Sequence, residues 1–380
     1  MRVQTKEGMS ASPQLIRPLL GMLVLTTTMT AQAACTVESR SFGTLASGEP
    51  VRAYTFRNDR IEATVLDYGG ILHEVRAPDR EGRRANVVRN LASLSDYERN
   101  TSFSRIIGRF AGRIGNGGFT LDGRRHELAA RPDGITSHGG PRGFGSRLWH
   151  ARASECGVDL ALSSSDGENG FPGTLQVKAA FRLDGGDLHI DYRATTDKPT
   201  VVNLTHHAFF NLSGAPDVYG HRLAVHADRW LPTDAKRVPT GEIAPVAGVL
   251  DLREGRGVGA VAHADDPAIR ANLGLDHTFV LNGGHAATLS ESASGRVLEV
   301  FTSEPGIVVF SANGWNGSLR DTEGRPLLKG GGLALETQHF PNSPNIPTFP
   351  STVLRPGSPL HTTTIFRFRT DARESQVLPR

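Results

Sequence analysis

The chain has 380 residues, 38% hydrophobic and 21% charged, a composition typical of a globular protein with enough apolar material for a large core. Its formal net charge of +3 falls to +1 for residues 35–380, which hold 39 basic and 38 acidic residues. So balanced a charge argues against nucleic-acid or membrane-surface binding, which would require basic residues gathered on one face.

The first 34 residues have the pattern of a secretory signal peptide. Three basic residues are followed by a short apolar run at 19–25 and by small residues at 31–34 that form an A-x-A cleavage site. The run is too short to cross a membrane, which takes roughly 20 apolar residues. We therefore expect an exported protein, periplasmic or secreted, with a single domain over residues 35–380 and no membrane span.

The two cysteines, Cys35 and Cys156, both lie in the part predicted to be exported. An oxidising compartment permits a disulfide between them. Cys35 also follows the signal directly, where a lipid can be attached, although Gln32 occupies a position that is normally aliphatic in lipoprotein signals. Both fates of Cys35 stay open on the sequence alone.

Short alternating runs separated by Gly, Asp, Asn and Pro dominate the rest of the chain. The runs 175–183 and 188–194 flank a glycine turn and predict a β-hairpin. Long helical periodicity is hard to find. Similar strand–turn units recur at 118–123, 297–301 and 362–368. Together with 43 glycines and 22 prolines, they predict an all-β protein with two large antiparallel sheets packed as a sandwich and few short helices.

Two glycine-rich segments precede the hairpin. Residues 107–117 carry Arg109 and Arg113, and residues 136–144 carry His138 before two glycines. Glycine lets the backbone approach a ligand, and Arg and His supply donors. A phosphate cradle is the competing interpretation, but the Walker spacing is missing. These segments therefore indicate contact with a ligand through backbone and Arg or His donors, rather than a phosphate-binding loop.

The next feature is a pair of adjacent histidines, His206 and His207, in a strand-like run. Neighbouring strand residues point to opposite faces, so one of the two at most can face a given pocket. This argues against a metal site, which needs ligands on one face. A histidine can deliver a proton near neutral pH, but packing against aromatic residues explains the pair equally well.

Two carboxylates complete the candidate site. Asp276 begins the apolar run 276–281, where it could simply cap a turn. Glu336 lies in 335–345, after three glycines and before three prolines. We expect it at a strand end, rigidly held but reachable, and therefore suited to act as a base. A surface glutamate at a strand terminus is the alternative.

Taken in this order, the segments resemble the aldose 1-epimerase family, also called galactose mutarotases, over most of residues 35–380. The element around Gly108–Ile114 matches except that Gly112 replaces the family Asn, and His206 replaces a second Asn so that the family His falls on His207. Leu335-Glu336-Thr337-Gln338 with its prolines is the most specific match.

The resemblance implies a β-sandwich enzyme without metal or cofactor that interconverts the α and β anomers of free aldohexoses such as glucose and galactose. Glu336 would take the proton of the C1 hydroxyl and His207 would protonate the ring oxygen, which opens the ring for reclosure on the other face. Arg113, His138 and Asp276 would hold the sugar hydroxyls.

Three alternatives stay open on the sequence. A glycosidase would use Asp276 and Glu336 as paired carboxylates roughly 5 to 9.5 Å apart. A non-catalytic carbohydrate-binding protein would need aromatic platforms, and three Trp and five Tyr supply few. An epimerase of sugar phosphates on the same fold would need a cationic pocket. The sequence leaves the preferred sugar and the oligomeric state undetermined.

Overall fold

The computed structural model describes residues 1–4, 8 and 35–371. The chain divides into Met1–Ala34 and Cys35–Arg380, and nearly all of the predicted signal peptide lies outside the described residues. The described residues contain no helix that is long and apolar enough to span a membrane.

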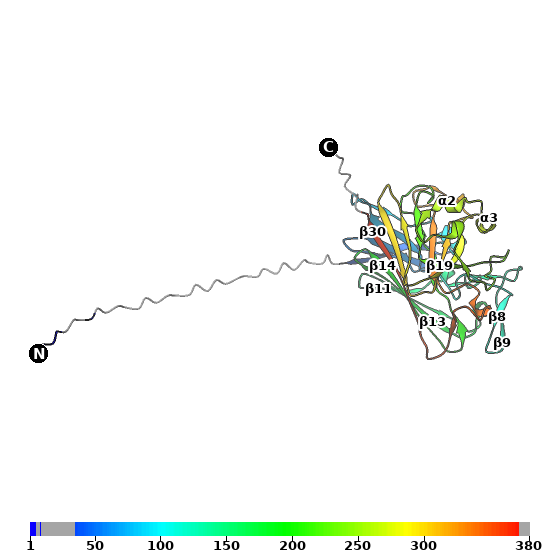
Figure 1. Ribbon diagram of the computed structural model, residues 1–380. Coiled ribbons are helices and arrows are strands. Elements are labelled where there is room, and N and C mark those ends of the chain that lie inside the picture. Colours follow the sequence, from blue (N-terminus) through cyan, green and yellow to red (C-terminus); the bar gives the residue numbers. More distant parts are fainter. Residues whose placement is uncertain (5–7, 9–34, 372–380) are drawn as a thin grey trace, which may run out of the picture. The chain divides into compact units, whose positions relative to one another are not determined.

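A nine-stranded sheet forms one layer of the domain. Its longest strands are neighbours in the sheet and run side by side in Figure 1. In sheet order the strands are β11 (His150–Ser154), β12 (Gly157–Ser164), β13 (Leu175–Asp184), β14 (Asp187–Thr196), β30 (Leu360–Thr370), β24 (Arg296–Thr302), β23 (His285–Ser290), β18 (Arg222–Val225) and β21 (Arg256–Gly257).

A six-stranded sheet faces it, and a five-stranded sheet is built from the first strands of the domain. The six-stranded order is β17 (Phe209–Phe210), β28 (Leu333–Gln338), β25 (Gly306–Phe310), β22 (Asp276–Leu281), β19 (Ala227–Leu231) and β20 (Ala244–Pro245). The five-stranded order is β1 (Thr36–Thr44), β2 (Pro50–Arg57), β3 (Glu62–Leu66), β4 (Leu72–Pro78) and β5 (Arg84–Asn86).

Two-stranded ribbons and short helices make up the rest of the regular structure in the described residues. The ribbons are β6 (Ile106–Ile107) with β16 (Thr205–His206), β7 (Arg113–Ile114) with β10 (Thr136–Ser137), β8 (Gly118–Leu121) with β9 (Arg124–Glu127), β15 (Thr200–Val201) with β29 (Val353–Leu354), and β26 (Asn316–Arg320) with β27 (Pro326–Leu328). The helices are α1 (Leu94–Arg99), α2 (Val258–Ala262) and α3 (Pro267–Asn272).

The core lies between the nine-stranded and six-stranded sheets. Phe181 and Ile190 of the first sheet belong to the same buried cluster as Ile307, Val309 and Leu335 of the second. Because side chains alternate along a strand, the residues between these in β25 and β28 point away from the core. The predicted all-β antiparallel sandwich is confirmed.

The predicted hairpin is also confirmed. β13 and β14 pair in antiparallel register from Asp184 and Asp187 onward, joined by a two-residue turn in which Gly185 has a φ of 53°. Glycine adopts this left-handed conformation without steric cost. Buried and outward residues alternate along both strands, as expected where only one face packs on the core.

Of two further local predictions, one is confirmed and one was wrong. The strand–turn unit predicted at 118–123 is confirmed: β8 ends at Leu121, and Asp122 and Gly123 form the turn into β9 with φ values of 49° and 77°. Glu336 does not end its strand: β28 continues to Gln338, since it pairs with β25 as far as Gly306. The carboxylate therefore projects from the interior of a sheet.

Candidate active site

Three adjacent strands of the six-stranded sheet form the floor of a pocket. Thr278, Val308 and Glu336 are direct neighbours across β22, β25 and β28 and form one row of side chains. Asp276 pairs with Phe310 in the next row on the same face, two residues along these strands. These five side chains share the face opposite to the core, as alternation requires. The floor thus holds two carboxylates separated by an apolar strand.

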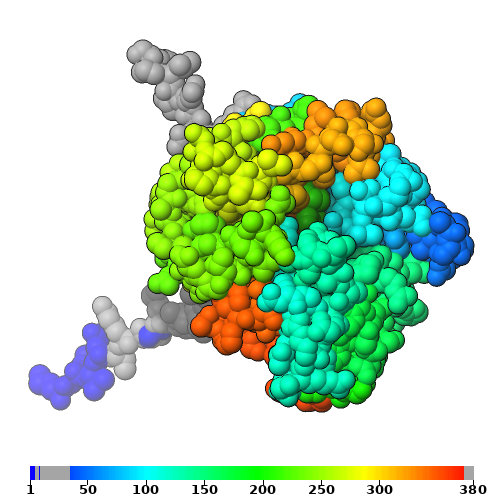
Figure 2. Space-filling model, turned by 90° about the vertical axis from the view of Figure 1, so that its right-hand side faces the viewer, coloured from blue at the N-terminus to red at the C-terminus, as the bar shows by residue number. Residues whose placement is uncertain are grey.

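The pocket over this floor has a volume of about 180 Å³. One water molecule needs only about 10–15 Å³ of such space, so the pocket can take a small organic molecule. Figure 2 shows a hollow near the centre of one face, where cyan, yellow-green and orange parts of the surface meet. All five predicted site residues line the pocket, which is bounded by Ser102, Gly112, Arg113, His138, His207, Thr233, Arg237, Pro239, Asp276, Thr278, Val308, Phe310, Glu336, Gln338 and Pro341.

Glu336 and His207 form the buried centre of this pocket. His207 Nε2 lies 3.3 Å from Glu336 Oε1, and the two residues are only 5% and 3% exposed. Glu336 Oε2 and His207 Nδ1 have no hydrogen-bond partner among the described residues. Buried polar atoms are rarely left unpaired, so this pair is arranged to meet a polar ligand.

Burial also sets the protonation of the pair. Loss of solvation raises the pKa of Glu336, and the nearby Asp276 raises it further. The same loss of solvation lowers the pKa of the His207 imidazole. Both shifts favour the neutral forms. Burial therefore favours a protonated carboxyl group beside a neutral imidazole, an arrangement in which the pair holds one proton.

A second group of polar side chains lies beside the pair. Arg113 Nη2 donates a hydrogen bond to Asp276 Oδ2 at 3.2 Å. The His138 ring meets the His207 ring edge to face, with centroids 5.6 Å apart, and its Nδ1 accepts a hydrogen bond from the Gly112 N–H at 3.4 Å. Donors and acceptors thus stand together in the pocket, as the binding of several hydroxyl groups requires.

The His-Gly-Gly turn is explained by the backbone around it. His138 and Gly139 have φ values of 52° and 83°, and a Cβ at Gly139 would stand 2.0 Å from the Gly108 carbonyl oxygen. Only glycine fits there. The Asn169 side-chain amide donates to the Gly139 carbonyl oxygen at 2.8 Å and fixes the turn that presents His138.

Arg109 has a structural role, in contrast to Arg113. It is 2% exposed, and its guanidinium donates to the carbonyl oxygens of Ser164, Pro172 and Gly173 at 2.8–3.0 Å. It thereby holds the segment that carries Asn169. The two arginines of the glycine-rich motif therefore separate into an anchor and a pocket residue.

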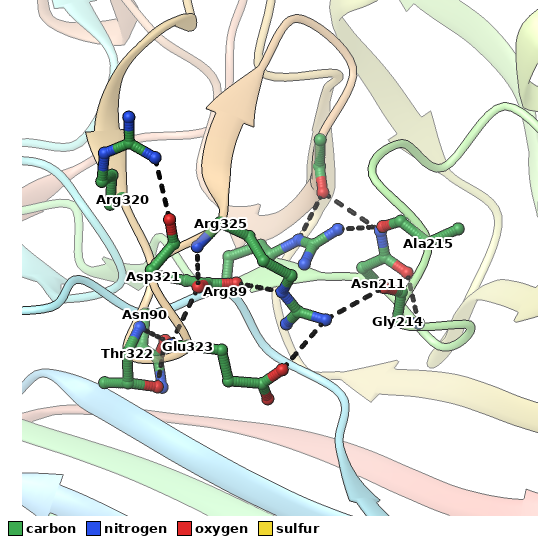
Figure 3. Close-up of polar contacts among 12 residues, drawn as sticks. Arg89, Asn90, Asn211, Gly214, Ala215, Arg320, Asp321, Thr322, Glu323 and Arg325 are labelled. Atoms are coloured by element: carbon green, nitrogen blue, oxygen red, sulfur yellow. Dashed lines mark hydrogen bonds and ion pairs between the residues drawn. The ribbon is translucent and has the colours of Figure 1, made fainter.

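A polar network ties together the segments around β17 and β28 (Figure 3). Arg89 Nε and Asn211 Nδ2 both donate to the Gly331 carbonyl oxygen, at 2.7 and 3.1 Å. Arg325, in the turn of the β26–β27 hairpin, joins the hairpin to this network because its Nη1 donates to the Gly214 carbonyl oxygen at 3.4 Å. Because Gly331 precedes β28 and Asn211 follows β17, the network helps to fix the two segments that carry the buried pair.

The described residues contain no group of three or more His, Cys, Asp or Glu side chains placed to hold a metal ion.

Comparison with known proteins agrees with this geometry. The model of the aldose 1-epimerase family matches residues 52–367. The chain is 39% identical over 336 residues to the galactose mutarotase of Homo sapiens, covering 86% of this chain and 97% of that protein. The chain belongs to the aldose 1-epimerase family. It is also 37% identical over 335 residues to the aldose 1-epimerase of Escherichia coli K12, covering 84% of this chain and 96% of that protein.

Solved structures of the family share the fold. Galactose 1-epimerase from Lactobacillus acidophilus NCFM superposes with a TM-score of 0.80 at 28% identity, covering 89% of this chain and all of that one. The aldose epimerase homologue from C. elegans superposes with a TM-score of 0.77 at 27% identity, covering 82% of this chain and 97% of that one.

Gly112, which departs from the family pattern noted in the sequence, is fixed by its surroundings. Its φ is 77°, and a Cβ there would lie 2.8 Å from two atoms of the Pro341 ring. An Asn at this position would therefore displace Pro341.

His206, the other departure, lies outside the pocket. Its Nε2 lies 3.1 Å from the Gly70 carbonyl oxygen, and its ring meets Phe181 edge to face in the core. Burial lowers the pKa of His206 to about 3, so it stays neutral. The predicted separation of the adjacent histidines onto opposite faces is confirmed.

Sequence reasoning missed Arg237, which also lines the pocket. It belongs to the loop after β19, a strand that pairs with the Asp276 strand. No motif marks this loop, and only the pairing of β19 with β22 brings it to the pocket. A charged residue in a short loop between Pro232 and Pro239 was the one available signal.

Proposed function

We propose that this protein is an aldose 1-epimerase that interconverts the α and β anomers of free aldoses. The observation that carries the proposal is the buried Glu336–His207 pair, 3.3 Å apart, beside the Arg113–Asp276 pair in one pocket. Family membership supports the same reaction. The reaction needs one acid and one base near a bound sugar, and these residues supply both.

In this mechanism Glu336 accepts the proton of the C1 hydroxyl while His207 protonates the ring oxygen. The C1–O bond of the ring breaks and leaves a free aldehyde. Rotation about the C1–C2 bond presents the other carbonyl face, and the ring oxygen attacks C1 as both proton transfers reverse. The pair begins and ends with one proton, so no other proton donor is required.

The buried setting makes this pair responsive to its ligand. Without a ligand, burial favours the shared proton on Glu336, whereas the reactive arrangement is a carboxylate beside an imidazolium. Hydrogen bonds from sugar hydroxyls to the carboxylate favour the ionised form. Binding of the substrate therefore promotes the arrangement from which the ring opens.

The glycosidase alternative is less well supported by the site. A glycosidase needs two carboxyl groups astride the scissile bond. Here the direct partner of Glu336 is a histidine, while Asp276 accepts a hydrogen bond from Arg113. Asp276 is better placed to hold a hydroxyl group.

Polarimetry tests the proposed function. Purified protein added to freshly dissolved α-glucose or α-galactose should speed the approach to the equilibrium rotation well beyond the buffer rate. Nitrophenyl glycosides provide the matched test for hydrolysis. No acceleration with any aldose, or release of nitrophenol, would refute the assignment.

We also propose that the protein is exported. The signal-like pattern of residues 1–34 supports this, as does the disulfide between Cys35 and Cys156, whose Cα atoms lie 5.3 Å apart. Disulfides persist mainly in oxidising compartments. The bond also argues against a lipid on Cys35, because a lipid thioether would need the same sulfur atom.

A further inference from the structure

The pocket holds two guanidinium groups but a single carboxylate that pairs with them. Arg113 Nη2 hydrogen-bonds to Asp276 Oδ2 at 3.2 Å, whereas Arg237 Nη1 is 4.0 Å from the same oxygen. The second distance is too long for a hydrogen bond. Among the described residues the Arg237 guanidinium makes no other ion pair or hydrogen bond, so its donors are available to a ligand.

The loop that carries Arg237 is tightly built. Asp234 Oδ1 accepts hydrogen bonds from the backbone N–H groups of Lys236 and Val238, at 2.8 and 3.0 Å. Arg237 itself has a φ of 61°, and its N–H donates to the Asp234 carbonyl oxygen. This turn places the guanidinium on the pocket wall, where the side chain is 42% exposed and a ligand can reach it.

The pocket carries one surplus positive charge. The Glu336–His207 pair is neutral overall when it shares one proton, whichever residue holds that proton. Asp276 contributes one negative charge against the two positive charges of Arg113 and Arg237. Burial lowers the pKa of the remaining lining histidine and keeps it neutral. A neutral sugar would leave this surplus positive charge without a counter-charge, whereas a ligand with one negative charge would neutralise it.

We infer that the substrate is an aldose that bears a carboxylate, a hexuronic acid, and that Arg237 binds this carboxylate. The inference rests on the proposed function and names its substrate class. A guanidinium fork matches a carboxylate with two parallel hydrogen bonds. A phosphate group carries about −1.5 to −2 charge, more than the pocket balances.

The distances across the floor agree with this assignment. Glu336 and Asp276 stand on β28 and β22, two places apart in the sheet, and the usual strand spacing separates these strands by about 9.5 Å. Asp276 also lies two residues along β22 from Thr278, which is in the row of Glu336, so the two carboxylates stand at opposite ends of the floor. Glu336 acts at the anomeric carbon, so Arg237, beside Asp276, faces the far end of the sugar. The Arg113–Asp276 pair can then bind the sugar hydroxyl groups that lie between the anomeric carbon and the carboxylate.

The test compares kcat/KM for galacturonate and glucuronate with kcat/KM for galactose and glucose, at low and at physiological salt. The hexuronates should be preferred by about 10-fold or more at low salt, and less so at higher salt, because screening weakens the attraction. Arg237→Gln should lower the hexuronate-to-hexose ratio by about 10- to 100-fold, the range for a hydrogen bond to a charged group.

Arg229→Gln is the matched control. Arg229 is an exposed arginine on β19 that does not line the pocket, so its loss removes the same charge and should leave the ratio unchanged. Arg237→Lys keeps the charge without the fork and should retain part of the preference.

Equal kcat/KM for hexuronates and hexoses, or an Arg237→Gln variant that loses both activities in proportion, would overturn this inference while leaving the proposed function intact. A preference for hexose 6-phosphates over hexuronates would overturn the assignment of a carboxylate. A protein that accelerates mutarotation of none of these sugars would instead refute the proposed function itself.

Discussion

At the scale of single residues, the adjacent histidines have opposite environments. We expect His207→Asn to lower kcat by about 10² to 10⁴, the usual contribution of a positioned acid or base. His206→Asn should change kcat by less than about 10-fold, because that side chain faces the core. Mutarotation rates of both variants, with unfolding curves to confirm that each is folded, provide the measurement. A larger loss of activity in His206→Asn would mean that the acid is misassigned.

The buried pair also predicts the pH dependence. Catalysis needs one proton on the pair, and burial lowers the pKa of His207 from 6.5 and raises that of Glu336 from 4.5. The pair therefore takes up a second proton, on His207, only well below pH 6.5. It loses its last proton, from Glu336, only well above pH 4.5. We expect kcat/KM to be level across neutral pH and to fall on both sides.

The profile of kcat/KM against pH, corrected for the buffer reaction, checks this expectation. A solvated Glu–His pair with ordinary pKa values would hold one proton only between about pH 4.5 and 6.5. A maximum confined to that interval would show that the pair is not desolvated.

At the scale of elements, the contact between the Gly112 turn and Pro341 can be measured with a matched pair of glycines. Gly112 and Gly123 share a φ of 77°, but a Cβ at Gly112 meets Pro341 at 2.8 Å whereas one at Gly123 meets nothing within 4 Å. Gly112→Asn should therefore lower the free energy of unfolding by about 1–3 kcal/mol more than Gly123→Asn, the usual cost of overpacking.

Urea unfolding of both variants gives the difference. Equal destabilisation would mean that the left-handed backbone, rather than the contact with Pro341, selects glycine at position 112.

At the scale of the whole molecule, the disulfide joins two cysteines that are 121 positions apart. Closing so long a loop stabilises by up to about 4 or 5 kcal/mol in the entropy model, although strain often reduces this. We expect reductant to lower the unfolding midpoint of protein recovered from an oxidising compartment.

Intact mass before and after alkylation checks the bond, and the same spectrum locates the mature N-terminus, which we expect at Ala34 or Cys35. Two freely alkylated thiols without reductant would contradict the disulfide. A mass that still includes residues 1–33 would contradict removal of the signal.

Periodicity was sufficient to predict the sheets and the opposite orientation of His206 and His207, because alternation along a strand depends on local geometry. Motifs shared with the family singled out the other pocket residues. Arg237 could not be predicted, since its place depends on the pairing of β19 with β22. The packing of Gly112 on Pro341 was likewise hidden, because it joins segments far apart in the sequence.

The most direct test of the central claim is the mutarotation rate of Glu336→Gln. The amide keeps the size of the side chain but cannot accept the C1 proton, so kcat should fall by about 10² to 10⁴ while sugar binding and the unfolding midpoint stay close to those of the wild type. Polarimetry, together with calorimetric titration of the sugar, measures both. A Glu336→Gln variant with near wild-type turnover would show that Glu336 is not the base and would contradict the proposed mechanism.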